Sequence, residues 1–222
     1  MTQVKICGIR SAEHAIVAAE AGAQFIGIVF AASRRQVSPQ AARALLREAR
    51  QASAAIGRDT KVVGVFVNAS AAEMNEVASL CGLDYLQLNG DESLDLCNQL
   101  QRPVLKAVRI DPSQPLEQAV EQARQAIREL RRHGHLPLLD CAATGAYGGA
   151  GQAFDWRVAE ALDGLFLLAG GLTPENVGDA VRRVRPWGVD VSSGVETGGV
   201  KDSDKIHAFL SAVRQVEALR QV

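Results

Sequence analysis

The sequence has few cysteines and no excess of charge of one sign. Its four cysteines, Cys7, Cys81, Cys97 and Cys141, form no C-x-x-C pair and are too sparse for a disulfide framework in 222 residues. We therefore expect reduced thiols. The formal net charge of −1 argues against a protein that holds nucleic acid or an anionic membrane through bulk electrostatics. Any anion that binds must be met by a local site.

Long apolar runs are also missing. The chain does not begin with an apolar segment behind a basic one, and no uninterrupted apolar stretch approaches the ~20 residues that span a bilayer. These absences predict a cytoplasmic protein without a membrane segment. The histidines include one close pair, His133 and His135, but no carboxylate or thiol at ligand spacing supports a metal there, so we expect no metal site.

What is present is the composition of an ordinary globular protein. Hydrophobic residues make up 47% of the chain and charged residues 22%, and the length falls within the range of one domain. We predict a single domain over residues 1–222. A (β/α)8 barrel typically needs about 250 residues, with ~200 near the lower limit, so a barrel of this length has short loops.

Short apolar or β-branched runs alternate with longer segments of helical periodicity. The runs predict eight strands, at residues 4–7, 25–30, 61–67, 85–88, 104–108, 136–140, 166–169 and 189–191. The longer segments predict helices at residues 11–21, 39–52, 71–80, 115–132, 174–184 and 201–219. A doubly wound open sheet and a closed barrel would both bury such strands. Eight units in this length, without a G-x-G-x-x-G sequence after the first strand, favour the α/β class and a single (β/α)8 TIM barrel.

Three helix starts are marked by capping residues. Ser11, Ser38 and Thr173 each precede a proline or an acidic residue within the next two positions. This is the pattern of a side-chain N-cap followed by a favourable first turn. We expect helices to begin directly after each of these three residues.

Candidate catalytic residues lie where strands end, because the active site of such a barrel is at the C-terminal ends of its strands. Cys7 ends the first predicted strand and Asp140 the sixth. A free cysteine is commonly a small buried hydrophobe, but Lys5 shares a strand face with Cys7, and a cation there would favour a thiolate. Asp140 suits general acid catalysis, with a cap or an ion-pair partner as its structural alternative and Asp190 as the rival carboxylate.

Glycine and serine clusters follow the last two predicted strands. Gly170 and Gly171 come after the seventh strand, and Ser192, Ser193 and Gly194 come after the eighth. Glycine allows close approach of backbone N–H groups to an anion, and the loops after strands seven and eight are the usual phosphate site of these barrels. A single Gly-Gly turn often only reverses the chain, but two clusters on adjacent strands predict a phosphate-binding site.

Two loops offer further candidates. Arg34 and Arg35 follow the second strand, where a planar guanidinium would bind a substrate carboxylate with two hydrogen bonds, although most arginines are surface residues. Residues 142–151 contain four glycines next to Asp140 and suggest either a mobile lid or only a loose connection.

An ordered set of motifs resembles the phosphoribosylanthranilate isomerase family over nearly the whole chain. The motifs are Lys5-Ile6-Cys7-Gly8-Ile9, Ser33-Arg34-Arg35, Ser38-Pro39, Gly64-Val65-Phe66-Val67-Asn68, Gln87-Leu88, Gly148-Gly149-Ala150-Gly151, Phe154-Asp155-Trp156, Gly170-Gly171-Leu172, Pro174-Glu175-Asn176-Val177 and Val189-Asp190-Val191-Ser192-Ser193-Gly194-Val195-Glu196. One position departs from the family pattern: Asn89 stands where the family usually has histidine before a glycine. Asparagine keeps a hydrogen-bonding side chain but does not titrate near neutral pH.

The resemblance implies a reaction and a role for each candidate. The reaction is the Amadori rearrangement of N-(5-phosphoribosyl)anthranilate to 1-(2-carboxyphenylamino)-1-deoxyribulose 5-phosphate in tryptophan biosynthesis, without metal or cofactor. Asp140 would be the general acid and Cys7 the base, Arg35 would hold the anthranilate carboxylate, and the phosphate would lie on the backbone around Gly171, Ser193 and Gly194. The family includes monomers and homodimers, so either state is open.

Other functions share parts of this pattern. The analogous isomerase of histidine biosynthesis and a ribulose-phosphate epimerase would have a similar phosphate site, and the fold alone does not separate them. The cysteine on the first strand argues against the histidine-pathway enzyme, because that family typically uses two aspartates in its active site. A non-catalytic phosphosugar-binding barrel would keep the glycine and serine clusters but would not need Cys7 and Asp140 together.

Overall fold

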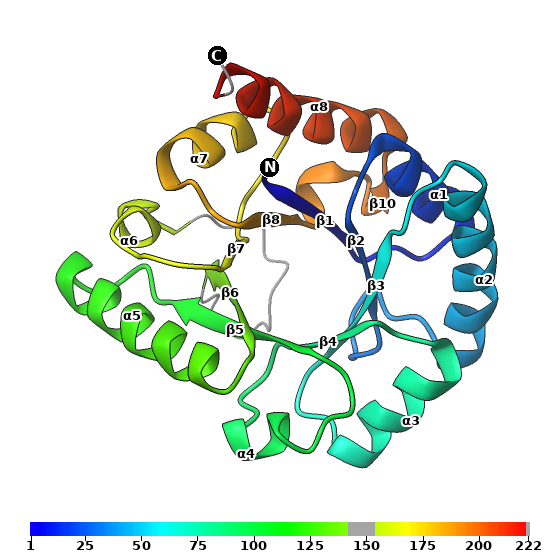
Figure 1. Ribbon diagram of the computed structural model, residues 1–222, viewed down its shortest axis with the longest axis horizontal. Coiled ribbons are helices and arrows are strands. Elements are labelled where there is room, and N and C mark those ends of the chain that lie inside the picture. The colour runs from blue at the N-terminus through cyan, green and yellow to red at the C-terminus, as the bar shows by residue number, and fades with distance from the viewer. Residues whose placement is uncertain (142–153, 221–222) are drawn as a thin grey trace.

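Eight parallel strands close into a barrel in the computed structural model, which describes residues 1–141 and 154–220. The strands are β1 Gln3–Cys7, β2 Phe25–Val29, β3 Lys61–Phe66, β4 Tyr85–Leu88, β5 Val104–Ile110, β6 Leu136–Cys141, β7 Leu167–Leu168 and β8 Gly188–Val191. They pair in chain order, and β8 returns to pair with β1, so the sheet has no open edge (Figure 1). The predicted (β/α)8 barrel is confirmed, and the open-sheet alternative is excluded.

Helices surround the barrel on its outside (Figure 1). They are α1 Ala12–Ala21, α2 Pro39–Ala55, α3 Ala71–Cys81, α4 Leu94–Cys97, α5 Leu116–Arg132, α6 Arg157–Glu160, α7 Val177–Val184 and α8 Ser203–Leu219. The sequence did not predict α4 and α6, because four residues are too few to display a helical period. A short hairpin, β9 Glu196–Thr197 and β10 Val200–Lys201, follows the 3-10 turn Ser193–Val195 and was not predicted either.

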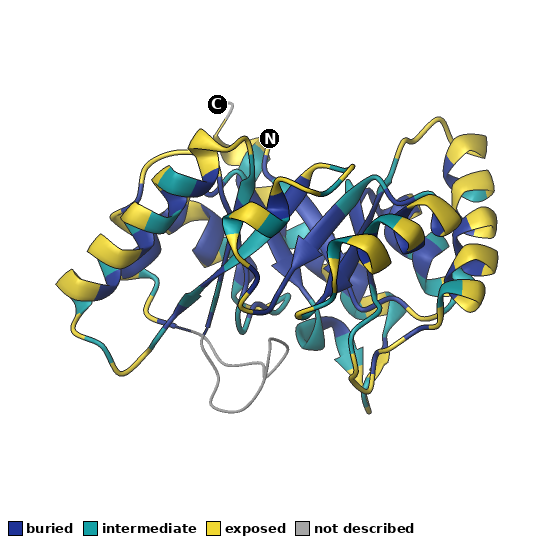
Figure 2. Ribbon diagram, turned by 90° about the horizontal axis from the view of Figure 1, so that it is seen from below, coloured by how far each residue is buried: buried dark blue, intermediate teal, exposed yellow. Residues whose placement is uncertain are grey.

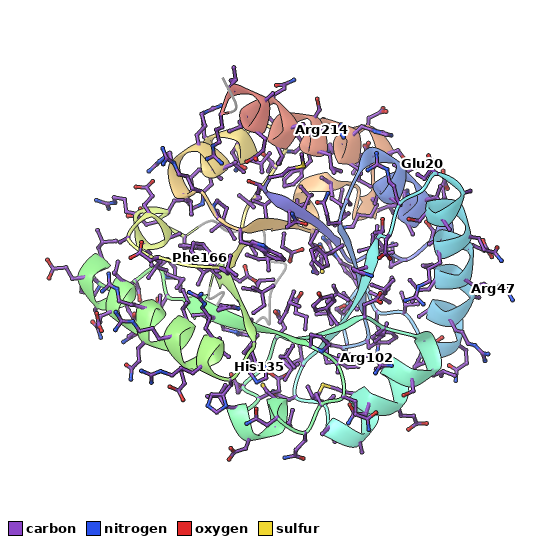
Figure 3. All side chains as sticks on the ribbon, viewed as in Figure 1. Glu20, Arg47, Arg102, His135, Phe166 and Arg214 are labelled. Atoms are coloured by element: carbon purple, nitrogen blue, oxygen red, sulfur yellow. The ribbon has the colours of Figure 1, made fainter. Side chains whose placement is uncertain are left out.

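The helices pack on the barrel through one apolar face each. In α5 the buried residues are Ala119, Ala123, Ile127 and Leu130, which recur every three or four positions, as an amphipathic helix requires. The other positions of α5 carry most of the charged residues and face solvent. Figure 2 shows this division for the whole molecule, with buried strands inside and exposed surfaces on the outer helices. In Figure 3, Phe166 points into the interior, whereas Arg47 points outward from α2.

A separate apolar cluster fills the barrel at the N-terminal ends of its strands. Phe25 and Tyr85 are the first residues of β2 and β4, and their rings contact edge to face with centroids 5.6 Å apart. Trp187, directly before β8, packs on Phe25 from another side at 5.9 Å. These aromatic side chains close one end of the barrel, so a ligand site must lie at the other end.

The predicted helix starts are correct at two positions and wrong at the third. The side chains of Ser11 and Ser38 cap α1 and α2 by accepting hydrogen bonds from backbone N–H groups of the first turn. Thr173 does not cap a helix, because α7 begins only at Val177. The Asn176 side chain instead accepts a hydrogen bond from the Thr173 N–H and donates one to the Gly171 carbonyl, which holds residues 171–176 in a turn.

Candidate active site

A cavity of about 360 Å³ opens at the C-terminal ends of the strands. Its walls come from β1, β2, β3, β4, β6 and β8 and from loops at the same end of the barrel, including the loop after β7. The predicted site residues that line it are Cys7, Arg35, Asp140, Gly170, Gly171, Ser192 and Ser193. Residues that are far apart in the sequence therefore meet at one barrel mouth, on the side opposite the aromatic cluster.

Cys7 lies beside a buried ion pair between Lys5 and Asp190. The Lys5 side chain is completely buried, and its Nζ lies 3.0 Å from Asp190 Oδ1. The pairing of β1 with β8 places Lys5 opposite Asp190, so the barrel register brings the two charges together. Gly27 on β2 leaves room for this group: a Cβ there would lie 2.9 Å from Cys7 Sγ and 3.0 Å from Lys5 Nζ. A side chain at position 27 would therefore displace the thiol or the ammonium group.

Opposing effects act on the acidity of Cys7. Burial raises the pKa of the thiol, the positive charge of Lys5 lowers it, and the negative charge of Asp190 raises it again, with a net rise. Lys5 thus favours the thiolate, as expected from the sequence, but burial outweighs it. Burial lowers the pKa of Lys5 as well, yet Asp190 and Cys7 leave that pKa raised, so Lys5 carries its charge at neutral pH.

Asp140 is a carboxylic acid whose pKa suits proton donation near neutral pH. Burial and the nearby charge of Asp190 raise the pKa of Asp140 to about 6, although the hydrogen bond from the Cys141 N–H and the charge of Arg109 act in the opposite direction. Arg109 pairs with Asp140 in the β5 to β6 register. A carboxyl group with such a pKa is partly protonated at physiological pH and can act as a general acid.

Arg35 is held at the rim of the cavity by a buried carboxylate. Its Nε and Nη2 donate to the two oxygens of Glu196, at 2.6 and 2.9 Å, and Lys201 Nζ contacts the same carboxylate at 2.8 Å. Burial raises the pKa of Glu196, but the hydrogen bonds from Arg35 and Lys201 and their charges lower it more strongly. The resulting pKa is about 2, so Glu196 remains ionised. The pairing with Glu196 uses Nε and Nη2 and does not involve Nη1, and Arg35 lines the cavity.

The two glycine and serine loops form one side of the cavity mouth. Gly170 and Gly171 have φ values of 82° and 64°, a backbone conformation that other residues rarely adopt. Lys201 Nζ donates to the Ser192 carbonyl at 2.8 Å and so brings a positive charge to this loop. Gly194 packs against the neighbouring loop, where a Cβ would lie 1.9 Å from the Leu172 carbonyl oxygen. Gly194 thus allows the two loops to touch.

One element of the predicted phosphate site is corrected. The sequence placed a helix N-terminus directly after Thr173, but the helix α7 begins at Val177, and residues 173–176 form a turn. The positive end of the α7 dipole is therefore farther from the cavity than expected. Backbone N–H groups, hydroxyl groups and the nearby Lys201 remain as the groups that can meet an anion here.

Comparison with known proteins identifies the family. A family model described as N-(5'phosphoribosyl)anthranilate (PRA) isomerase matches residues 4–212. The chain belongs to this family. An isomerase of this name from Roseiflexus castenholzii is 47% identical over 95% of this chain and 97% of its own length.

Solved structures of PRA isomerases agree with this match. The structure of phosphoribosyl anthranilate isomerase from Thermotoga maritima covers 97% of this chain and 100% of that chain, with a TM-score of 0.79 and 35% identity. A structure of a phosphoribosyl anthranilate isomerase in complex with reduced 1-(o-carboxyphenylamino)-1-deoxyribulose 5-phosphate has the same coverage, a TM-score of 0.74 and 34% identity. The predicted family is confirmed, and with it an isomerase of tryptophan biosynthesis.

Sequence reasoning missed several residues around the PRA isomerase site. Glu196 and Lys201 received no role, because nothing in the local sequence shows that they meet Arg35. Gln87 on β4 and Asn89 directly after this strand line the cavity, and only the family motif drew attention to them. The suggested lid at residues 142–151, with Gly145, Gly148, Gly149 and Gly151, lies outside the described residues.

In residues 1–141 and 154–220, no group of three His, Cys, Asp or Glu side chains is arranged to hold a metal ion. Within the same ranges, no helix combines the length and the apolar character that crossing a membrane requires.

Proposed function

We propose that this chain converts N-(5-phosphoribosyl)anthranilate into 1-(2-carboxyphenylamino)-1-deoxyribulose 5-phosphate by general acid and base catalysis. The observation that carries the proposal is one cavity whose lining includes a thiol, Cys7, a carboxyl group of raised pKa, Asp140, an arginine, and the glycine and serine loops after β7 and β8. The substrate has the matching groups: a carboxylate at one end, a phosphate at the other and the reacting sugar between them.

Ring opening comes first and falls to Asp140. The protonated carboxyl group donates its proton to the furanose ring oxygen, the bond between that oxygen and C1′ breaks, and the nitrogen lone pair forms an iminium ion. The Asp140 carboxylate that results is stabilised by the Cys141 N–H and by the charge of Arg109. Burial and the negative charge of Asp190, in contrast, favour the protonated form of the resting carboxyl group.

Proton removal from C2′ follows and falls to Cys7. The thiolate takes the proton, the electron pair forms a double bond between C1′ and C2′, and the iminium nitrogen becomes neutral, which gives an enolamine that tautomerises to the ketone. Burial opposes the thiolate, and Lys5 is the group that favours it. The base therefore depends on the buried lysine beside it.

The two anionic ends of the substrate bind to different parts of the cavity. Arg35 presents two N–H donors to the anthranilate carboxylate, while Glu196 holds the guanidinium in place. Val29, Val65 and Val67 line the neighbouring wall and suit the aromatic ring. The phosphate is bound by the loops after β7 and β8, with Gly171 and Ser193 among its contacts.

Replacing Arg35 with alanine is expected to raise KM for phosphoribosylanthranilate by about 10- to 100-fold with a smaller change in kcat, because hydrogen bonds to a charged group are lost in ground and transition state alike. Steady-state kinetics measure this. Arg34→Ala is the matched control, because Arg34 also pairs with Glu196 but its side chain is 59% exposed, and its KM is expected to change less than about twofold. An unchanged KM in Arg35→Ala would mean that Arg35 does not hold the carboxylate.

The pH dependence follows from the proton count of the acid and the base. Catalysis needs Asp140 protonated and Cys7 ionised, a state with one proton fewer than the fully protonated pair. Because the pKa of Asp140 is about 6 and that of Cys7 is raised, the first proton leaves the pair near pH 6. We expect kcat/KM to rise with pH up to about 6 and then to level off, and this limb to be absent in Asp140→Asn. A decrease of kcat/KM from pH 6 upward in the native protein would contradict these roles.

The function is tested by complementation of a bacterial strain that lacks phosphoribosylanthranilate isomerase. Expression of this chain is expected to restore growth without tryptophan, and an empty vector is not. A second strain, which lacks the analogous isomerase of histidine biosynthesis, separates the sibling chemistry. Rescue of the histidine strain alone, or of neither strain despite soluble expression, would overturn the proposal.

A further inference from the structure

Gln87 lines the cavity and has a buried hydrogen-bond acceptor without a partner among the described residues. The residue lies on β4, is 3% exposed and lines the cavity. Its Nε2 donates to Asn89 Oδ1 at 3.2 Å. Among the described residues nothing donates to its Oε1. Buried polar atoms are nearly always paired, and leaving one unpaired is unfavourable, so this oxygen calls for a donor that residues 1–141 and 154–220 do not supply.

The surroundings fix which atom of Gln87 is left for a ligand. Asn89 Oδ1 accepts a hydrogen bond from Gln87 Nε2. If the side-chain amide of Gln87 turned by 180°, its own oxygen would face Asn89 Oδ1, and two acceptors would oppose each other. The residues paired with Gln87 on the neighbouring strands are Val65 and Leu105, whose side chains have no donor. The departure from the family pattern at position 89 therefore has a local consequence: an asparagine oxygen sets the orientation of Gln87.

The position of β4 selects the part of the substrate that Gln87 meets. In the closed ring of strands, β4 lies across from β8 and next to β5, which lies across from β1 (Figure 1). If Cys7 on β1 removes the proton on C2′, that hydrogen points toward β1, and the other substituents of this tetrahedral carbon point away from it. The hydroxyl group is one of these substituents, and Gln87 on β4 belongs to the side of the barrel away from β1.

The other donors of the substrate are less suited. The carboxylate and the phosphate are anions and only accept hydrogen bonds. The amine N–H is ortho to the substrate's own carboxylate, with which it closes a six-membered hydrogen-bonded ring. A sugar hydroxyl group is the donor that remains for an acceptor at the centre of the barrel mouth.

We infer that Gln87 accepts a hydrogen bond from the C2′ hydroxyl group of the substrate and is a substrate-positioning residue of this site. The inference rests on the proposed function and adds a contact to it. The contact orients C2′ so that its hydrogen faces Cys7. It is present while the oxygen carries a proton and is lost when the product ketone forms, because the ketone oxygen has no proton to donate. Gln87 therefore distinguishes substrate from product.

The experiment compares the binding of two ligands by calorimetry. One is reduced 1-(o-carboxyphenylamino)-1-deoxyribulose 5-phosphate, the compound bound in a related structure, which carries a hydroxyl group on the carbon equivalent to C2′. The other is the same compound without that hydroxyl group. We expect the native protein to bind the hydroxyl compound about 10-fold more tightly, and Gln87→Met to reduce this ratio to within about twofold of one. Gln51→Met, at an exposed position of α2, is expected to keep the native ratio.

Several outcomes would overturn the inference. Equal binding of both ligands to the native protein would overturn it. This measurement needs no variant, so it decides the matter even if Gln87→Met does not fold. A purely structural role for Gln87 would weaken both ligands together and leave the ratio unchanged. A third ligand, which lacks the C3′ hydroxyl group instead, tests the neighbouring carbon. If Gln87→Met reduces the preference for the C3′ hydroxyl group and leaves the preference for the C2′ hydroxyl group unchanged, the contact is made at C3′ and the inference is wrong. Turnover by the native protein is measured separately, and its absence would mark failure of the proposed function instead.

Discussion

Asp140→Asn is expected to lower kcat by about 10²- to 10⁴-fold, the usual contribution of a general acid. Asparagine has nearly the same shape and can still accept the hydrogen bond from the Cys141 N–H. It has no acidic proton to give to the furanose oxygen. The loss should therefore appear in kcat, with little change in KM or in the thermal unfolding midpoint. Steady-state kinetics under saturating substrate measure it.

A control for Asp140→Asn removes a carboxylate that is not in the cavity. Asp155 lies between β6 and α6 and pairs with the exposed Arg157. Asp155→Asn is expected to keep kcat within about twofold, since exposed ion pairs contribute little. A loss of less than tenfold in Asp140→Asn would count against the role of Asp140 as the general acid, and the rival carboxylate Asp190 would then be tested in the same way.

Cys7→Ala is expected to lower kcat by a similar factor of about 10² to 10⁴, because the base that removes the C2′ proton is gone. The variant leaves the ion pair between Lys5 and Asp190 in place, so the barrel interior keeps its charge balance. Single-turnover kinetics separate this chemical step from product release.

The matched control for Cys7→Ala is Cys97→Ala. Cys97 is as buried as Cys7, at 2% against 7% exposed, but lies in α4 outside the cavity. Its loss is expected to affect stability alone, by creating a small cavity. If both variants lowered kcat equally, or if Cys7→Ala retained more than a tenth of the native kcat, Cys7 would be a packing residue and not the base.

The barrel and the positions of its strands could be predicted because each strand carries its own signal. A run such as Phe25–Val29 is apolar on both faces, and the alternation with helices then limits the topology to few choices. The same reasoning predicted that Cys7 and Asp140 lie at the same end of the barrel, because each lies at the C-terminal end of a strand in a closed parallel sheet. Elements without a local period, such as α4, α6 and the β9 to β10 hairpin, could not be found this way.

The contacts that tune the site could not be predicted from the sequence. Lys5 pairs with Asp190, 185 residues away, because the sheet closes with that register. Arg35 and Glu196 are 161 residues apart and meet only because the hairpin after β8 folds over the loop after β2. The start of α7 was misplaced because Thr173, Pro174 and Glu175 have the composition of a first helical turn, while the Asn176 side chain stabilises a different turn. Such competition between local patterns is decided by tertiary contacts.

The most direct test of the account is turnover of freshly generated phosphoribosylanthranilate, followed by the loss of its fluorescence, in the presence of a metal chelator. The native protein, Asp140→Asn and Cys7→Ala are compared at equal concentrations, after circular dichroism has shown that all three are folded. The account predicts turnover by the native protein that the chelator does not affect and a loss of about 10²-fold or more in each variant. Absence of turnover by the folded native protein, or full activity of either variant, would contradict it.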